Sequence, residues 1–452
     1  MRISVFLAVL GLASPLVIAA PRGDWPAPNI ILILADDLGY GDVGCYGCPD
    51  IRTPAIDRLA REGVRFTSFY SNGPECTPTR TALMTGRYQQ RVPGMECAIG
   101  LGDVGRYDDA ERLAAAGNLG LPAEKNLLVR GLLQAGYRPA AFGKWHLGYR
   151  PPFAPLRHGF AEFFGPLGGA VDYFYHCEPD GTPMLYAGNG PVEREGYMTD
   201  LITEAATAFL HARPQDRPFF LYVAYTAPHT PIQAPGAKPP APCSAEAWNE
   251  GDRAAYAAMV ESMDRGIADL LEVLRQEQLE ANTLVIFCSD NGGTSLGRNA
   301  PFSGGKGGLF EGGIRVPCIV RWPGVLPKNA VSDQTCITMD WTRSLLRVAG
   351  APAEAVDGLD GVDILQMIEA DAPIQERTLF WRQRRGARTW RAIRDGRLKY
   401  IEREDDGRRT DYLFDLIADP EETSNLLEEK PADAERLRKL LRRWEQEVAS
   451  SP

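Results

Sequence analysis

Short, almost wholly apolar runs alternate along this chain with longer stretches of helical character, and this alternation constrains the possible folds most. The run Asn29–Ala35 (NIILILA) has no polar face, which is typical of a strand covered on both sides. Similar runs occupy 139–142, 219–225, 283–289 and 316–321, and helical stretches occupy 53–62, 125–135, 198–212 and 254–276. The alternation predicts an α/β fold with a large, mainly parallel or mixed sheet sandwiched by helices.

The pattern changes near residue 370. Runs at 379–381, 390–394 and 398–401 have the character of short antiparallel strands, and 432–448 has that of a charged closing helix. We therefore expect a main domain over residues 21–372, which would hold the functional site. A smaller C-terminal subdomain, built from antiparallel strands and a helix, would occupy residues 373–452.

Residues 1–20 have the features of a signal peptide. Arg2 supplies a positive start, the segment Val5–Ile18 is mostly apolar, and Ala19 and Ala20 are small enough for cleavage. The run contains Pro15 and stops short of a full span, although a retained anchor is the alternative. We expect a secreted or periplasmic protein. No second run of about 18 apolar residues occurs, so stable membrane insertion is not expected.

The charge and cysteine counts limit the function. The formal net charge is -10, from 49 basic and 59 acidic residues, which argues against binding to nucleic acid or another polyanion. An anionic substrate would then need positive charge concentrated in one pocket. Nine cysteines are an odd number for an exported chain, so one is expected to be free, modified or paired between chains.

Polar side chains follow four of the predicted strands. In an open α/β sheet, ligands bind outside the carboxyl ends of the strands, so these side chains predict one polar site. Singly, each has an ordinary alternative, because an Asp pair is often a turn or helix cap and a single histidine is often structural. The residues are Asp36 and Asp37, Lys144 and His146, His229, and Asp290 and Asn291.

The oxygen-rich part of this set indicates a metal site. Three carboxylates and one amide carbonyl suit Ca²⁺ or Mg²⁺ better than zinc. Calcium accepts an irregular, carboxylate-rich cage, whereas Mg²⁺ keeps more water, which favours calcium. Because such ions do not favour imidazole, His146 and His229 stay available for proton transfer.

The most specific segment is Cys76-Thr77-Pro78-Thr79-Arg80, which is followed by Thr85-Gly86-Arg87. Here the sequence resembles the type I (formylglycine-dependent), arylsulfatase-like sulfatases of the alkaline-phosphatase superfamily, whose signature is Cys-x-Pro-x-Arg with a following Thr-Gly-Arg. Thr79 replaces the serine most often found at that position. The resemblance covers nearly the whole mature chain, with matching blocks at 28–42, 143–148, 226–229, 289–292, 306–317 and 413–416.

The resemblance implies that a maturation enzyme converts Cys76 to formylglycine (3-oxoalanine), whose hydrated aldehyde acts as the nucleophile beside one calcium ion. One hydroxyl of the hydrate would attack sulfur, and loss of the proton on the other would re-form the aldehyde and release sulfate. The alternative for Cys76, a plain buried thiol, would leave the oxygen-rich site without a nucleophile. The implied metal ligands are the modified Cys76 with Asp36, Asp37, Asp290 and Asn291.

The remaining catalytic roles are also implied by matching family residues. Arg80 would stabilise the modified residue, while Lys144 and Lys306 would neutralise the sulfate oxygens. His146 is the expected base for the second hydroxyl, and His229, with Lys306, the expected acid for the departing alcohol. Lys306 lies in a run of glycines (GGKGG), so a flexible loop is its alternative.

The substrate is expected to be a carbohydrate sulfate, cleaved in exo fashion, or a small aryl sulfate. The segment Met95–Leu121 shows no clear periodicity and is expected to form a loop over the pocket mouth. Asp172, Tyr173 and His176, with Arg382 between Trp381 and Gln383, could contact a sugar, although each could equally be structural.

Three rival functions share some of these features. A phosphomonoesterase or phosphodiesterase of the same superfamily would use Thr or Ser and more histidine ligands, and the chain has only five histidines. A phosphonate monoester hydrolase shares formylglycine and is the closer rival. A catalytically inactive sugar-binding module is the third, and the presence of every expected site residue argues against it.

Overall fold

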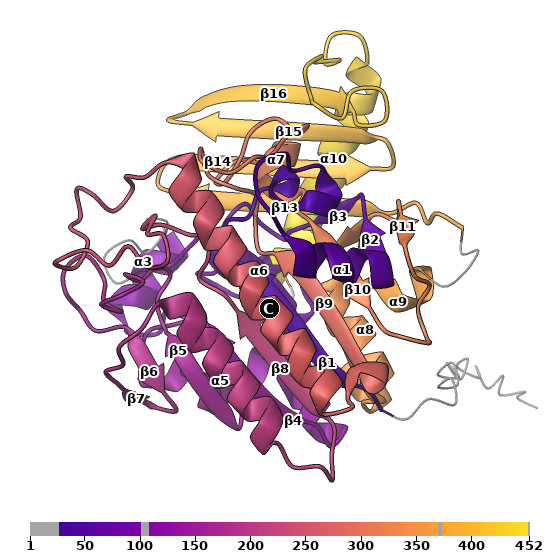
Figure 1. Ribbon diagram of the computed structural model, residues 1–452. Helices are drawn as coiled ribbons and strands as arrows, with labels where there is room; N and C mark the ends of the chain where they lie inside the picture. Colours follow the sequence, from indigo (N-terminus) through magenta and orange to yellow (C-terminus); the bar gives the residue numbers. More distant parts are fainter. Residues whose placement is uncertain (1–26, 101–107, 369–372, 451–452) are drawn as a thin grey trace, which may run out of the picture.

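The computed structural model describes residues 27–100, 108–368 and 373–450, so the predicted signal peptide lies outside the described residues. Within these ranges a ten-stranded sheet forms the centre of the molecule (Figure 1). From one edge to the other, its strands are β11 (Ala330–Ser332), β2 (Val64–Phe66), β10 (Cys318–Arg321), β9 (Thr283–Ser289), β1 (Asn29–Ala35), β8 (Phe219–Ala224), β4 (Arg138–Gly143), β5 (Glu162–Pro166), β6 (Leu185–Ala187) and β7 (Gly190–Pro191).

The middle of the sheet is parallel. β1 pairs in parallel with β8 on one side and β9 on the other, so Leu32 lies between Tyr222 and Ile286, and β4 continues the parallel pairing beyond β8. Antiparallel pairs lie on both sides of this centre, between β9 and β10 and between β5 and β6. Every residue of β1, β8 and β9 is buried, as expected for apolar runs covered on both faces. The predicted mixed sheet is therefore confirmed.

Helices cover both faces of the sheet. α5 (Met198–Ala212) and α6 (Arg253–Gln276) pack against each other over the face turned to the viewer, and α1 (Pro54–Glu62) packs against α6 (Figure 1). A second group, α2 (Cys76–Thr85), α4 (Leu127–Gln134) and α8 (Asp340–Ala349), packs together on the other face. Among the described residues, no helix has the length and apolar character needed to cross a membrane.

The C-terminal part forms its own sheet. Four antiparallel strands occur here in the described part of the chain: β13 (Thr378–Arg385), β14 (Arg388–Asp395), β15 (Leu398–Asp405) and β16 (Arg408–Asp415). The sequence predicted the first three, and missed β16 because its first half is exposed and charged. α10 (Pro431–Ser450) follows and buries Leu437, Leu441 and Trp444. Figure 1 shows this sheet at the top of the molecule, beyond the end of the central sheet.

The two parts share a core. Tyr70, Leu309 and Ile314 of the first part cluster with Trp381 and Trp444 of the second. Tyr70 belongs to the short strand β3 (Phe69–Tyr70), which pairs with β12 (Cys336–Ile337), and Ile314 ends α7 (Glu311–Ile314). A further short helix is α9 (Ile364–Met367). The predicted boundary at residue 372 falls among residues outside the described ranges and stays a prediction.

One predicted loop contains a helix. The segment Met95–Leu121 was expected to lack regular structure, but α3 occupies Asp108–Ala115. Residues 101–107 of this segment lie outside the described residues. α3 is too short to show a clear helical period in the sequence. Its apolar residues Ala110 and Leu113 lie against Gly94, and this tertiary contact stabilises it.

Candidate active site

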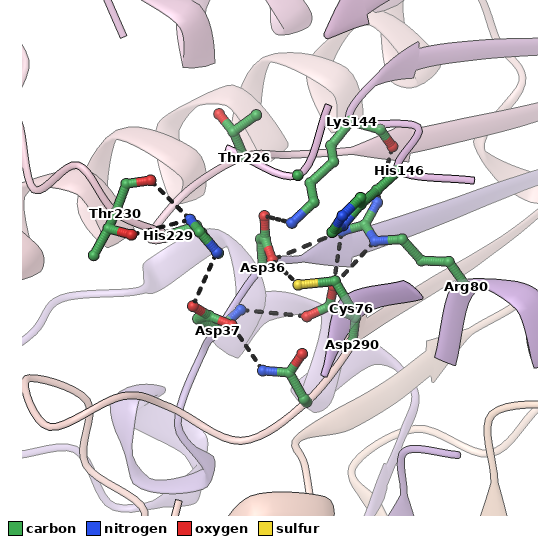
Figure 2. Close-up of polar contacts among 12 residues, drawn as sticks. Asp36, Asp37, Cys76, Arg80, Lys144, His146, Thr226, His229, Thr230 and Asp290 are labelled. Carbon is green, nitrogen blue, oxygen red and sulfur yellow. Dashed lines mark hydrogen bonds and ion pairs between the residues drawn. The ribbon is translucent and has the colours of Figure 1, made fainter. Parts of the chain in front are cut away.

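The polar residues that follow four strands come together at one edge of the sheet. Because β9, β1, β8 and β4 are neighbours and parallel, their carboxyl ends lie side by side. β1 delivers Asp36 and Asp37, β9 delivers Asp290 and Asn291, β4 delivers Lys144 and His146, and β8 leads to His229. Figure 2 shows the side chains of Asp36, Asp37, Lys144, His146, His229 and Asp290 converging with Cys76 and Arg80. The topology therefore explains why residues far apart in sequence share one site.

Cys76 is the first residue of α2 and faces this cluster. Glu75 before it is extended, and Pro78 is tolerated because it lies in the first helical turn. The Cys76 Sγ donates to Asp36 Oδ1 at 3.3 Å, and the side chain is 1 % exposed. Burial, and then the charge of Asp36, raise the pKa of this thiol well above its usual value. An unmodified thiol here is protonated and would be a poor nucleophile.

Arg80 lies one turn further along α2 and holds Asp290. Its Nε and Nη2 donate to Asp290 Oδ2 at 3.0 and 2.8 Å, and its Nη1 donates to the Lys144 carbonyl at 2.8 Å. Nη2 also lies 3.9 Å from Asp36 Oδ1. Burial, and then Asp36, raise the pKa of Asp290 to about 6. Arg80 thus positions two of the expected metal ligands.

Each of the two lysines pairs with one carboxylate after β1. Lys144 Nζ donates to Asp36 Oδ2 at 2.6 Å, and Lys306 Nζ donates to Asp37 Oδ2 at 2.7 Å. Although burial favours the neutral acid, Lys306 and His229 hold the pKa of Asp37 well below its usual range. The backbone of Asp37 is left-handed, with φ 64°, which costs free energy and points its carboxylate into the cluster.

The glycine-rich loop around Lys306 is anchored. The Lys306 N–H donates to the Gly293 carbonyl at 3.1 Å, and the Gly307 N–H donates to the Pro74 carbonyl at 2.9 Å. The loop also packs closely on Gly313, where a Cβ would lie 2.1 Å from the Gly308 carbonyl oxygen. The glycines therefore permit close backbone packing, and the flexible-loop interpretation of this segment is disfavoured.

His146 is held in one tautomer. Its Nε2 lies 2.6 Å from the Ile99 carbonyl, which can only accept, so Nε2 carries the proton. The buried Nδ1 has no hydrogen-bond partner among the described residues and is left as an acceptor. Burial, and then Lys144, lower the pKa of His146 well below its usual value. The ring packs on Gly169, where a Cβ would lie 2.5 Å from its Cε1 and Nε2 atoms. A neutral imidazole with a free nitrogen can act as a base.

His229 has the opposite tautomer. Its Nδ1 donates to the Thr230 carbonyl at 2.7 Å, and its Nε2 accepts from Lys306 Nζ at 2.9 Å. Burial, and then Lys306, lower the pKa of His229 to about 3. The Tyr173 hydroxyl lies 3.0 Å from the His229 carbonyl and 2.7 Å from that of Thr226, which fixes the segment after β8.

The donor set fits a hard divalent cation. Ligand atoms of Asp36, Asp37, Cys76 and His229 lie within 4.8 Å of one another, and Asn291 Nδ2 donates to Asp37 Oδ1 at 2.7 Å. The buried Asn291 Oδ1 has no hydrogen-bond partner among the described residues. A buried carbonyl oxygen without a donor is costly, and a cation beside the carboxylates would satisfy it. His229, which was not expected among the metal ligands, also lies in this group, with its Nε2 3.5 Å from Asp37 Oδ2.

Two of the residues expected to contact a sugar have structural tasks. Asp172 has no exposed surface, and its carboxylate accepts from Phe174 N, Tyr175 N, Gln233 Nε2 and Cys243 N at 2.8–2.9 Å. Tyr173 is also fully buried, and its hydroxyl donates to the Thr226 and His229 carbonyls. A direct contact between either side chain and a substrate stays a prediction that this geometry does not favour.

Arg382 lies in β13 of the C-terminal sheet. Its guanidinium binds Glu96 through Nε at 2.7 Å and Nη2 at 2.9 Å, and it binds Glu445 of α10 at 3.2 Å. Its neighbour Gln383 donates to Glu75 Oε1 at 2.7 Å, directly before Cys76. Arg382 is therefore occupied by two carboxylates, and its contact with substrate also stays a prediction. His176 is buried as well, and its Nε2 lies 3.1 Å from the Gly196 carbonyl.

Several residues that shape the site carried no sequence signal. Thr77 Oγ1 donates to the His146 carbonyl at 3.1 Å and accepts from Ile99 N at 3.3 Å. Tyr222, in the middle of β8, places its hydroxyl 3.4 Å from Arg80 Nη1. A helical threonine or a tyrosine within a strand has no sequence pattern that marks such a role. Only the tertiary structure shows that Thr77 and Tyr222 support the site.

The packing of Asp172 leads to a stability prediction. Asp172→Ala leaves three partly buried backbone N–H groups and one amide without their acceptor, so we expect the free energy of unfolding to fall by at least about 3 kcal/mol. Asp180→Ala, an exposed site on the same hairpin, should change it by less than about 0.5 kcal/mol. Denaturant unfolding followed by fluorescence measures both. An Asp172→Ala protein as stable as the wild type would contradict this structural role and return Asp172 to the predicted substrate contacts.

Comparison with known proteins places this geometry in a family. The family described as Sulfatase matches residues 28–351, and the one described as N-sulphoglucosamine sulphohydrolase, C-terminal, matches residues 305–449. The N-acetylgalactosamine-6-sulfatase of Canis lupus familiaris is 35% identical over 383 residues, which cover 80% of this chain and 69% of the relative.

Solved structures show the same architecture. The crystal structure of Ps i-CgsB in complex with k-i-k-neocarrahexaose superposes with a TM-score of 0.80 at 32% identity, covering 93% of each chain. The phosphonate monoester hydrolase of Agrobacterium radiobacter has a TM-score of 0.63 at 21% identity, covering 93% of this chain and 96% of that one. The second likeness shows the shared fold alone.

Proposed function

The chain belongs to the sulfatase family and is a sulfuric ester hydrolase, and from that premise we propose that it releases sulfate from a carbohydrate sulfate, using formylglycine made from Cys76 and one calcium ion. The observation that carries the proposal is the position of Cys76. It begins a buried helix and faces the carboxylates at the ends of β1 and β9. The N-terminus of a helix favours negative charge, which suits a sulfate group bound there.

The environment of Cys76 supports its modification. A thiol here donates to Asp36 instead of ionising, although every other catalytic group surrounds it. In hydrated form, formylglycine would supply one hydroxyl to attack sulfur and a second whose proton is lost as sulfate departs. A dedicated maturation enzyme would be the required partner, and it would act on the chain before the site is buried.

Charge balance supports a divalent cation. The side chains of Asp36, Asp37 and Asp290 are matched by those of Arg80, Lys144 and Lys306. A bound Ca²⁺ would make the site positive, and it would polarise the nucleophile and the sulfate. Asp36, Asp37, Asp290 and Asn291 would hold the ion, with Asn291 contributing its unpartnered Oδ1. Once these carboxylates bind the metal, Lys144 and Lys306 are free to contact sulfate oxygens.

The two histidines have distinct tasks in this proposal. His146 offers an unprotonated Nδ1, so it can take the proton from the second hydroxyl. His229 carries its proton on Nδ1, directed at the backbone, so its Nε2 cannot donate in this state. Lys306 Nζ, bound to that Nε2, is the charged member of the pair and would supply the proton to the departing oxygen.

Because His229 Nε2 accepts from Lys306 Nζ and so holds the proposed proton donor in place, the acid role of this pair leads to a prediction about leaving groups. His229→Ala should lower kcat/KM for sugar sulfates, which leave poorly, by about 10²–10⁴-fold, and for nitrophenyl sulfate by about 10-fold or less. A good leaving group departs with little protonation, so it depends less on the acid. His211→Ala, on the exposed surface, should affect neither substrate. Equal losses on both substrates for His229→Ala would show that the residue serves binding only.

We also propose that the substrate is extracellular and that attack occurs at a sugar end. The relatives named above include a sulfatase of a sulfated amino sugar and a structure with a carbohydrate bound. A net charge of -10 disfavours binding along a long polyanion, and this supports exo action. The predicted signal peptide supports a secreted or periplasmic location.

Matched sulfate and phosphonate esters test the proposed reaction. With a common nitrophenyl leaving group, we expect kcat/KM for the sulfate to exceed that for the phosphonate by more than about 100-fold. The assay also includes galactose and N-acetylgalactosamine monosulfates, followed by release of inorganic sulfate. A preference for the phosphonate, or no turnover of any sulfate ester by mature protein, would contradict the proposal.

A further inference from the structure

A buried cluster of charged groups links the C-terminal subdomain to the loop that carries Lys306. Lys399 of β15 is fully buried, and its Nζ lies 2.8 Å from Glu311 Oε1 and 2.8 Å from Glu422 Oε1. Although burial favours the neutral amine, Glu311 and then Glu422 raise the pKa of Lys399, so the amine stays charged. One ammonium group therefore bridges two carboxylates from different parts of the chain.

A buried cluster of this kind is costly for the protein to form. Taking charges out of water is expensive, and a well-packed apolar set of similar volume is often as stable or more stable. A buried ion pair does hold its members in place, because a carboxylate that leaves its partner becomes an uncompensated buried charge. The cluster is therefore expected to fix the position of the element that it binds, which is α7.

α7 depends on such support. It has four residues, two of which are glycines, so neither its length nor its sequence makes it stable alone. The Glu311 N–H donates to Glu422 Oε2 at 2.5 Å. The Glu311 side chain also accepts from the Tyr70 hydroxyl at 2.6 Å and from Arg315 Nη1 at 3.1 Å. The first residue of α7 is thus held through its backbone and its side chain, and the C-terminal subdomain supplies Lys399 and Glu422 for this.

α7 in turn contacts the loop on both sides of Lys306. Before the lysine, the Ser303 carbonyl accepts from the Gly312 N–H at 2.7 Å. After it, the Gly308 carbonyl oxygen lies 2.1 Å from the position that a Cβ on Gly313 would take, so the two backbones are in close contact. A shift of α7 would therefore shift the backbone that carries Lys306.

The position of Lys306 matters because its ammonium group contacts two groups of the site. Its Nζ donates to Asp37 Oδ2 at 2.7 Å and to His229 Nε2 at 2.9 Å. A change far from the chemistry that misplaces a catalytic group by about 1 Å can cost about 100-fold in rate. The cluster around Lys399 is placed to prevent such a misplacement.

We propose that Lys399 is a positioning residue for sulfate ester hydrolysis: through Glu311 and Glu422 it fixes α7, and α7 holds Lys306 where it can protonate the departing oxygen. The C-terminal subdomain thereby serves the reaction as well as the fold. This inference rests on the proposed acid role of Lys306.

Kinetics of Lys399→Met test the inference, because methionine keeps most of the side-chain length and removes the charge. We expect kcat/KM for the galactose or N-acetylgalactosamine monosulfate that the mature wild type cleaves fastest to fall by about 10- to 100-fold. For nitrophenyl sulfate the loss should be about 5-fold or less, since a good leaving group needs little protonation. An equal loss with both substrates, or no loss with either, would overturn the inference.

A double-mutant cycle shows whether Lys399 acts through Lys306. In a Lys306→Ala background, adding Lys399→Met should change kcat/KM for the sugar sulfate by less than about 2-fold, because the group that it positions is already absent. If the two losses multiply, the cluster serves the fold only and the inference is wrong. Equal losses with both substrates in Lys306→Ala alone would instead contradict the proposed acid role, and the coupling between the two positions would still decide whether Lys399 acts through Lys306.

Two further variants separate positioning from stability. If Lys399→Met does not fold, the double variant Lys399→Met with Glu422→Gln takes its place, since it removes the ion pair without leaving an extra buried carboxylate. The same selective loss is expected, and its absence would overturn the inference. Glu402→Gln is the matched control, because Glu402 is also a buried member of β15, and its partners Arg391 and Arg442 belong to β14 and α10. It should lower Tm and leave kcat/KM for both substrates within about 2-fold.

Discussion

Cys76→Ala is expected to abolish sulfate ester hydrolysis, with kcat falling by at least about 10⁴-fold, while the protein stays folded. The side chain is the proposed precursor of the nucleophile, and the hydroxyls of Thr77 and Thr79 on the same helix end donate to the His146 and Gly73 carbonyls instead of facing Asp36. Alanine is small and apolar, so the buried helix start should tolerate it. Turnover of nitrophenyl sulfate and the circular dichroism spectrum measure the two effects.

Cys336→Ala is the matched control for this prediction. Cys336 in β12 is as fully buried as Cys76 but lies outside the site. Its substitution should cost some stability and leave kcat within about 2-fold. A Cys76→Ala protein that retains more than a few per cent of activity would show that another group attacks sulfur.

Removal of divalent cations is expected to have an effect of similar size. Chelation should lower activity by more than about 10³-fold, because the nucleophile and the sulfate would lose their main electrostatic stabilisation. Calcium should restore activity and raise Tm, since the ion binds only the folded site. Restoration by Zn²⁺ and not by calcium would overturn the assignment of the metal.

Asp37→Asn extends this test to the ligands. The substitution keeps the shape of the side chain and removes one charge from the cluster, so calcium should no longer raise Tm. Asp50→Asn is the control, since Asp50 is an exposed carboxylate paired with Arg253 away from the site. A calcium-dependent rise in Tm that persists in Asp37→Asn would remove Asp37 from the set of ligands.

The centre of the fold could be predicted because its strands are apolar on both faces. The predicted bounds of β1 and β9 agree with the structure at each end, since each apolar run ends directly before an aspartate, Asp36 after β1 and Asp290 after β9. Elements at the periphery of the fold have weaker sequence patterns. β16 begins with Arg408 and Arg409, whose exposed side chains hide the strand, and α3 is stabilised by contacts that local periodicity does not record.

The acidic and basic groups at the strand ends could also be predicted, because topology alone brings them to one edge. The residues that hold these groups in place could not be predicted. Glu75 is bound by Gln383 and Arg385, which lie more than 300 residues away in sequence. Asp172 looked like a group available to a sugar, but four donors from its own loop and from two distant segments occupy it. These roles depend on which distant residues the fold brings into contact, and the local sequence does not show that.

The modification of Cys76 can be measured directly. Active protein, produced with its maturation enzyme, is treated with iodoacetamide and digested, and the peptide that contains Cys76 is analysed by mass spectrometry with and without a hydrazide reagent. The account predicts that this peptide carries no alkylated thiol and forms a hydrazone at residue 76, in a fraction that rises with specific activity. A fully active preparation in which all of Cys76 is recovered as alkylated thiol would contradict it.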